Sequence, residues 1–81
     1  MSTITSDQIQ SRVFEALEEF GAEPDAISPD ATFESLDIDS LDLVELAQIV
    51  EDEYGVQLKG EDMEGVKTVR QAVDLVMSKL G

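Results

Sequence analysis

The sequence predicts an all-α fold: a small bundle of three longer helices and one short helix, with a long loop between helices one and two. Three observations lead to this fold class. Apolar residues recur every three or four positions in three segments, which is the spacing of one helix face. Glycine ends the first two segments, and both prolines fall in the unpatterned stretch between them. The 81 residues suffice for one small domain, which we place at residues 6–81 after a flexible N-terminus of residues 1–5.

The first helix is expected over residues 7–20, and a long loop follows it. Thr5 or Ser6 is a suitable N-cap, and Gly21 favours the end of the helix. The buried stripe consists of apolar residues at helical spacing: Ile9, Val13, Ala16, Leu17 and Phe20. Residues 21–39 show no sustained period and form the loop. Its large apolar side chains are expected to anchor it across the helices: Ile27, Phe33 and Leu36.

The other two longer helices have clear start signals. Helix two is expected to begin at Ser40, with Asp39 as its N-cap, and to end at Gly55. Its buried face is formed by Leu43, Leu46, Ala47, Val50 and Tyr54. The last helix is opened by Thr68, with Gln71 as the partner in a capping box. Its buried face is formed by Val69, Ala72, Val73, Val76 and Leu80.

A shorter segment separates these two helices. Residues 56–58 are expected to be extended, and residues 61–65 leave room for about one turn of helix. Met63 and Val66 are expected to point inward from this segment.

Cysteine and histidine are both absent from the sequence. Their absence removes a disulfide framework, a thiolate zinc site, the commonest general base and the commonest metal ligand. An enzyme is therefore not expected, and we assign no catalytic residue and no metal site.

The charge of the chain is strongly negative. Five basic residues against 19 acidic ones give a formal net charge of −14, which opposes binding to nucleic acid and to anionic membranes. No Lys or Arg occurs between Arg12 and Lys59, an interval that holds 14 of the acidic residues. Partners with basic surfaces are therefore expected. The N-terminus lacks the basic flank and apolar run of a signal peptide, and no later stretch approaches a membrane-spanning length, so we expect a soluble, cytoplasmic protein without membrane insertion. We also expect a monomer.

Helix two carries more apolar residues than one buried stripe needs. Leu41 and Val44 fall on the side away from the core face. Their neighbours on that side are polar or acidic: Asp42, Glu45, Gln48 and Asp52. A docking surface and the ordinary exposure of scattered apolar residues both fit this pattern.

Ser40 occupies the predicted first position of helix two. Unpaired backbone N–H groups and the helix dipole at this position favour an attached phosphate. Without neighbouring evidence, a serine that merely starts a helix is the more common case.

The neighbouring residues supply that evidence. The run Asp37-Ile38-Asp39-Ser40-Leu41-Asp42 resembles the Asp-Ser-Leu attachment site of acyl carrier proteins, and it stands in the same place, after a long loop and at the head of an acidic helix. The likeness covers nearly the whole chain. Its further landmarks are Phe33 and Leu36, Leu43-Val44-Glu45-Leu46, Glu51-Asp52-Glu53-Tyr54-Gly55-Val56 and Lys67-Thr68-Val69. The Asp-Ile-Asp-Ser-Leu form is most similar to carriers of dissociated fatty-acid synthesis in actinobacteria.

This resemblance implies that a phosphopantetheinyl transferase moves 4′-phosphopantetheine from coenzyme A to Ser40. The terminal thiol of this covalent cofactor then holds growing acyl chains as thioesters, so the carrier needs no cysteine of its own. The resemblance also implies partners with basic docking patches: ketosynthase, ketoreductase, dehydratase, enoyl reductase and acyltransferase enzymes of fatty-acid synthesis. A polyketide-synthase carrier is the alternative, and a peptidyl or aminoacyl carrier is less favoured because helix two is so acidic.

The resemblance implies two further sets of site residues. Partner docking is expected at Asp39, Leu41, Asp42, Val44, Glu45, Gln48 and Asp52. An acyl pocket is expected where small and branched side chains leave an expandable apolar gap: Leu46, Ala47, Val66 and Ala72. The chain departs from the common pattern at Asp37, where many relatives have Gly, and at Gln48, where an apolar residue is common. The interval from Phe33 to Ser40 is also one residue shorter than usual.

Two other classes fit the sequence poorly. A serine nucleophile at Ser40 needs a base, and the nearest lysines lie in no recognisable Ser-Lys signature. Asp37-x-Asp39 opens like an EF-hand loop, but Leu41 takes the third ligand position and Gln48 the place of the bidentate Glu. The acidic residues are therefore interpreted as a solvated face.

Overall fold

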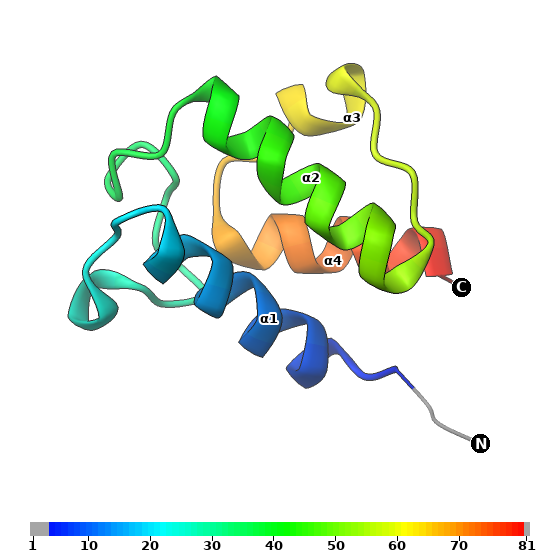
Figure 1. Ribbon diagram of the computed structural model, residues 1–81, viewed down its shortest axis with the longest axis horizontal. Helices are drawn as coiled ribbons and strands as arrows, with labels where there is room; N and C mark the ends of the chain where they lie inside the picture. Colours follow the sequence, from blue (N-terminus) through cyan, green and yellow to red (C-terminus); the bar gives the residue numbers. More distant parts are fainter. Residues whose placement is uncertain (1–3, 81) are drawn as a thin grey trace.

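The computed structural model describes residues 4–80 and confirms the all-α fold (Figure 1). Within this range, three longer helices and one short helix are present: α1 (Ser6–Glu19), α2 (Ser40–Tyr54), α3 (Gly60–Glu64) and α4 (Val69–Leu80). The loop between α1 and α2 also contains a short 3₁₀ turn, η1 (Pro24–Ala26), which the sequence pattern did not predict. Residues 1–3 of the predicted flexible N-terminus lie outside the described residues, as does Gly81.

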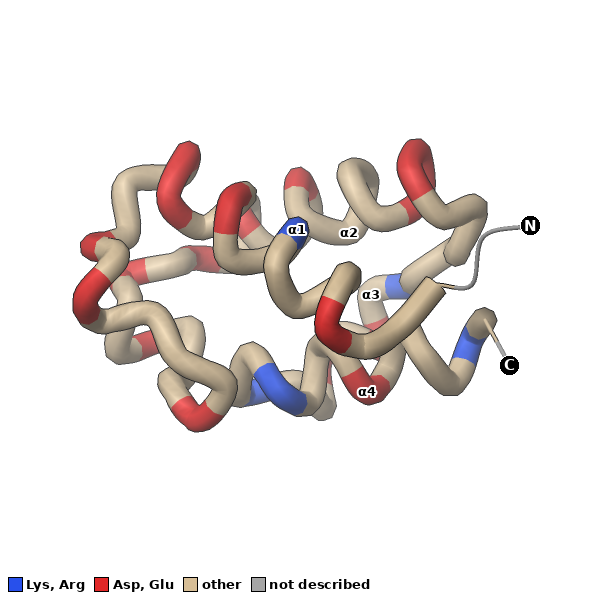
Figure 2. The backbone as a smooth tube through the Cα atoms, turned by 90° about the horizontal axis from the view of Figure 1, so that it is seen from below, with Lys and Arg blue, Asp and Glu red and all other residues tan. Residues whose placement is uncertain are grey.

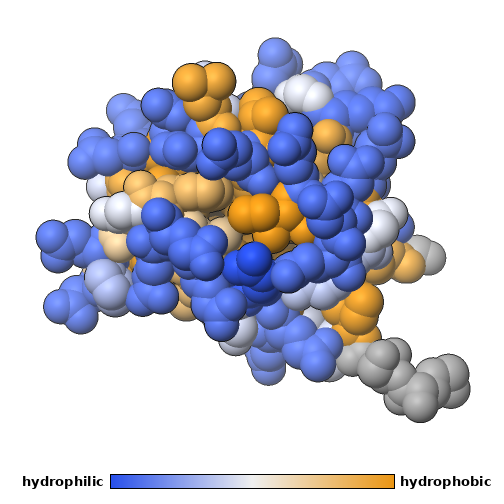
Figure 3. Space-filling view, viewed as in Figure 1, coloured by the Kyte–Doolittle hydropathy of each residue, from blue (hydrophilic) through white to orange (hydrophobic). Residues whose placement is uncertain are grey.

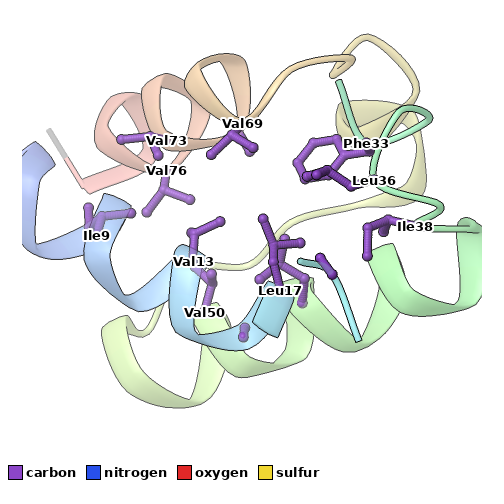
Figure 4. Close-up of a cluster of buried hydrophobic side chains, with 14 of the residues drawn as sticks. Ile9, Val13, Leu17, Phe33, Leu36, Ile38, Val50, Val69, Val73 and Val76 are labelled. Atoms are coloured by element: carbon purple, nitrogen blue, oxygen red, sulfur yellow. The ribbon is translucent and has the colours of Figure 1, made fainter. Parts of the chain in front are cut away.

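The core lies where α1, α2, α4 and the long loop meet (Figure 4). α1 and α4 form the most extensive contact between helices, and α2 buries Leu46 and Val50 in the same cluster. The large side chains with the least exposure are all aliphatic: Ile9, Leu17, Val13, Val50, Val69 and Val76. Figure 4 shows Phe33, Leu36 and Ile38 entering this cluster from the loop. The loop is thus anchored by its apolar side chains, as predicted for Phe33 and Leu36.

Both ends of α1 are closed by local hydrogen bonds. The Thr5 hydroxyl accepts a bond from the Gln8 N–H (3.2 Å), and the Gln8 side-chain oxygen accepts one from the Thr5 N–H (3.1 Å). At the other end, Gly21 adopts a φ of +105°, and the Ala22 N–H donates to the Leu17 carbonyl (3.0 Å). The helix ends where the sequence predicts because glycine adopts such a positive φ without steric cost.

The long loop is fixed to the N-terminus of α4 by backbone hydrogen bonds. The first two N–H groups of α4, those of Val69 and Arg70, donate to the carbonyls of Ala31 (3.1 Å) and Pro29 (2.8 Å). The third N–H group donates to the Thr68 hydroxyl (3.2 Å), as the predicted capping box requires. These are groups that a helix leaves unpaired. The loop therefore supplies the hydrogen-bond acceptors that the N-terminus of α4 lacks, and α4 fixes the backbone of the loop.

Residues 33–37 form a hydrogen-bonded turn that leads the chain to α2. The Ile38 N–H donates to the Phe33 carbonyl (2.9 Å) and the Asp37 N–H to the Glu34 carbonyl (3.1 Å), which is the pattern of a Schellman motif. Asp37 holds φ at +60°, and it is the one non-glycine residue with positive φ in residues 4–80. Glycine takes this left-handed conformation more easily than aspartate does. The departure at Asp37 noted above therefore falls where glycine would relieve strain.

Replacing Asp37 by glycine should stabilise the fold by about 0.5–1 kcal/mol, because relief of the left-handed conformation outweighs the added freedom of the unfolded chain. Asp37→Asn is the matched control, since it removes the same charge and keeps a side chain that tolerates this conformation. The free energy of unfolding of the three proteins is measured by urea denaturation. A glycine variant no more stable than the asparagine variant would show that the strain at this position is negligible.

Candidate functional site

Ser40 is the first residue of α2, and it is exposed. Asp39 is the N-cap: its carboxylate accepts a hydrogen bond from the Asp42 N–H at 3.0 Å, and the Asp42 carboxylate accepts one from the Asp39 N–H at 3.5 Å. This reciprocal capping fixes the start of the helix at the predicted residue. Asp42, a predicted docking residue, is half-buried and takes part in the cap.

The start of α2 favours a covalently attached phosphate over a free one. A helix leaves its first N–H groups without intrahelical partners, and its dipole favours negative charge at this end. The carboxylates of Asp37, Asp39 and Asp42 flank the same end and repel a free anion. A phosphodiester bonded to Ser40 is held there by a covalent bond, so it experiences the favourable field of the helix without having to bind against this repulsion.

The outward face of α2, made of Leu41, Val44, Glu45, Gln48 and Asp52, is open to solvent. Leu41 is 75% exposed and Val44 54% exposed. Figure 3 shows apolar residues interrupting an otherwise hydrophilic surface in the view of Figure 1. Helical spacing places all five residues on the side opposite the core-facing Leu46 and Val50. The structure therefore brings these predicted docking residues together on one face.

Acidic residues occur on every helix, whereas basic residues occur at only a few places (Figure 2). Arg12 of α1 pairs with Glu53 at 2.6 Å and so neutralises charge near the C-terminal end of α2. Within residues 4–80, no ion pair involves Asp42, Glu45 or Asp52. The outward face of α2 therefore keeps a negative electrostatic potential, which attracts positively charged surfaces.

A groove of about 470 Å³ runs between α2 and α3. Its α2 wall is formed by residues on successive turns: Ser40, Leu43, Val44, Ala47, Gln48 and Glu51. Its other wall is formed by Leu58, Lys59, Gly60, Met63 and Glu64. Because Ser40 is the first residue of α2, the groove starts beside it and follows the helix. A group attached to this serine can therefore fold back along the groove.

The predicted acyl-pocket residues and this groove have only Ala47 in common. Leu46 and Ala72 are buried in the core, and Val66 is half-buried against it. The sequence pattern selected residues at the centre of the buried faces, whereas the groove is lined by residues at their edges. Met63 was predicted to point inward, and it lines the groove from α3. The assignment of an acyl pocket to the four predicted residues stays a prediction.

The chemistry available at this site is that of an exposed hydroxyl group, which can form an ester with a phosphate. Ser40 supplies a hydroxyl group, and the sequence contains neither His nor Cys to act as base or nucleophile beside it. Within residues 4–80, no group of three or more acidic residues is placed to hold a metal ion. In the same range, none of the helices has the length and apolar character needed to cross a membrane.

Comparison with known proteins agrees with this chemistry. A family model described as "Phosphopantetheine attachment site" matches residues 11–76. The acyl carrier protein of Chlorobium phaeobacteroides is 38% identical over 78 residues, which cover 94% of this chain and 100% of that protein. The meromycolate extension acyl carrier protein of Mycobacterium leprae is 41% identical over 75 residues, which cover 90% of this chain. This chain spans 65% of the length of that mycobacterial relative.

A solved structure shows the same fold. The crystal structure of an acyl carrier protein from Thermotoga maritima is similar with a TM-score of 0.79 and 26% sequence identity. The match covers 93% of this chain and 89% of that one. The arrangement of four helices and a long first loop is therefore shared with a known carrier.

Asp39→Ala should lower the free energy of unfolding by about 1 kcal/mol, because the Asp42 N–H loses the acceptor that caps the helix. Asp39→Asn is the control, since it removes the same charge and keeps an oxygen that can accept the bond. Urea denaturation followed by circular dichroism measures both variants against the unsubstituted protein. An equal loss of stability in the two variants would mean that charge, and not capping, accounts for the effect.

Proposed function

This chain belongs to the acyl carrier protein family, and we propose that Ser40 is the residue to which its phosphopantetheine arm is attached. An acyl carrier protein catalyses no reaction itself and carries acyl chains on that arm. The observation that carries the assignment is the position of Ser40. It is exposed, it is the first residue of an N-capped helix, and it lines the groove between α2 and α3.

The other serines of the matched region support this choice by contrast. All four serines within residues 11–76 lie in the described part of the chain. Ser11 lies inside α1, and Ser28 lies in the long loop. The Ser35 hydroxyl donates to the Thr32 carbonyl at 2.8 Å. Only Ser40 combines a helix N-terminus with an open groove beside it.

Attachment requires the Ser40 oxygen to attack the phosphorus of the phosphate that joins pantetheine to the rest of coenzyme A. A phosphodiester bond to Ser40 forms, the nucleotide part of coenzyme A leaves, and the hydroxyl proton passes to a base. The chain has no His or Cys, and its carboxylates are weak bases at neutral pH. We therefore assign the base to the transferase. The thiol at the end of the arm then holds the acyl chain as a thioester.

We assign the groove between α2 and α3 to the acyl chain. Its lining includes five apolar side chains: Leu43, Val44, Ala47, Leu58 and Met63. Each methylene removed from water by such a lining contributes about 0.8 kcal/mol. Because the arm begins at Ser40, the attached chain reaches the groove without a change of fold. Sheltering of this kind protects the thioester between visits to client enzymes.

A phosphopantetheinyl transferase and enzymes of fatty-acid synthesis are the partners that membership of this family implies. We assign their docking to the outward face of α2, extended by Asp39 and Asp42. The unpaired carboxylates attract a basic patch at long range, and Leu41 and Val44 supply apolar contact at short range. The clients are then the ketosynthase, ketoreductase, dehydratase, enoyl reductase and acyltransferase, which act on a cytoplasmic monomer. Similarity to a protein named for meromycolate extension supports a fatty-acid chain as the cargo.

Incubation with coenzyme A and a promiscuous transferase should add one arm to the protein and none to Ser40→Ala, as measured by intact mass. Ser28→Ala, which removes a serine hydroxyl from an exposed residue of the preceding loop, should load like the unsubstituted protein. Circular dichroism checks that both variants are folded. An arm on Ser40→Ala would place the attachment elsewhere.

Glu45→Lys should slow arm transfer on the order of ten-fold at low ionic strength and progressively less as salt rises, because exposed charges steer encounter and are screened. Val44→Ala should slow transfer at all salt concentrations, since apolar contact is not screened. Initial rates are measured with saturating coenzyme A and varied carrier.

Glu18→Lys is the matched control for the change of charge, because Glu18 is exposed on α1, away from the outward face of α2. If Glu18→Lys and Glu45→Lys slow transfer equally, the effect comes from net charge and not from docking on α2.

A further inference from the structure

α3 forms one wall of the groove but contributes little to the core. It is five residues long, and none of its residues is buried. Gly60, Met63 and Glu64 line the groove, and Met63 is the only large apolar side chain in α3. A helix this short is not stable by itself. Its position therefore depends on the contacts that tie it to the rest of the protein.

One such contact is an ion pair on the far side of α3. Helical spacing places Asp62 away from the residues that line the groove. The Asp62 Oδ2 atom accepts a hydrogen bond from the Lys59 N–H at 3.2 Å and lies 3.3 Å from Nζ of Lys79 on α4. The Lys59 N–H and the Lys79 ammonium lower the pKa of the Asp62 carboxyl, because both favour its charged form. Among residues 4–80, this is the only ion pair that joins α3 to another helix.

The two ends of α3 are held differently. Beyond its C-terminal end, the Lys67 carbonyl accepts a bond from the Phe33 N–H (3.0 Å), and the Lys67 N–H donates to a side-chain oxygen of α4 (2.7 Å). At its N-terminal end, α3 follows the exposed Lys59, and Asp62 provides the link to α4. Without that link, this end is joined to the core through the half-buried Leu58. The N-terminal end of α3 is therefore the part most free to move.

We propose that Asp62 and Lys79 are positioning residues: their ion pair holds α3 beside α4 and thereby keeps the groove at the width that shelters the acyl chain. This inference rests on the assignment of the groove to the acyl chain. Neither residue lines the groove, so neither touches the cargo. They act through Gly60 and Met63, which move with α3 when the pair is broken. A displaced α3 leaves the thioester more open to water.

The test compares three substitutions in α4. Lys79→Gln removes the cation of the pair, and Lys79→Arg keeps one. Arg70→Gln is the matched control, because it breaks the Arg70–Asp30 pair (3.1 Å) near the other end of α4 with the same change in net charge. Amide hydrogen exchange of residues 60–64 is measured in the unloaded proteins. Hydrolysis of the thioester is measured after loading from octanoyl-coenzyme A.

Lys79→Gln should speed both exchange and hydrolysis about two- to five-fold, which matches the strength of a partly exposed ion pair. Lys79→Arg and Arg70→Gln should stay close to the unsubstituted protein. Asp62→Asn keeps an oxygen for the Lys59 N–H and should match Lys79→Gln. Combining these two substitutions should add nothing to either one alone, because they break the same pair.

Two results would overturn the inference. Unchanged exchange of residues 60–64 in Lys79→Gln would show that the pair does not hold α3. Faster exchange with unchanged hydrolysis would show that α3 does not control access to the cargo. Failure of the proposed function would look different, because an octanoyl thioester on the unsubstituted protein would then hydrolyse as fast as octanoyl-coenzyme A.

Discussion

Backbone hydrogen bonds join the long loop to the N-terminus of α4, and the position of Ser40 depends on these bonds. The N–H groups of Val69 and Arg70 bond to the loop carbonyls of Ala31 and Pro29. A long loop has high conformational entropy when it is free, and these bonds fix its backbone at Pro29 and Ala31. With the loop fixed there, Phe33 enters the core.

The rest of the path to Ser40 follows from local geometry. The turn over residues 33–37 ends in the left-handed Asp37, which directs the chain outward again. Ile38 then returns to the core, and Asp39 caps α2. Each step has its own hydrogen bonds, so Ser40, the proposed attachment residue, is placed by a series of short-range constraints that begins at α4. Ser40 is exposed because it is the first residue of α2.

The helix ends could be predicted because their signals are local. Thr5, Asp39 and Thr68 each cap a helix through residues three positions on, and Gly21 stops α1 by its own conformation. The register of the loop against α4 could not be predicted, because it is set by hydrogen bonds between backbone groups, which every residue type except proline carries in the same form. The groove between α2 and α3 could not be located from the sequence for a related reason. Periodicity identifies which residues of α2 turn inward, but only tertiary structure decides which of those α3 leaves uncovered.

With the arm attached at Ser40, as we propose, the acyl chain passes between the groove and a client enzyme within one complex. A group on a short flexible tether experiences an effective concentration on the order of millimolar at sites within its reach. The groove starts at Ser40, so under the proposed function it competes for the cargo at this local concentration, whatever the amount of carrier in the cell. A client enzyme docked on α2, as we propose, meets the cargo at a similarly high local concentration. Cargo is released to clients readily only if the groove binds it with modest intrinsic affinity, and a wall built from a five-residue helix without buried residues suits that requirement.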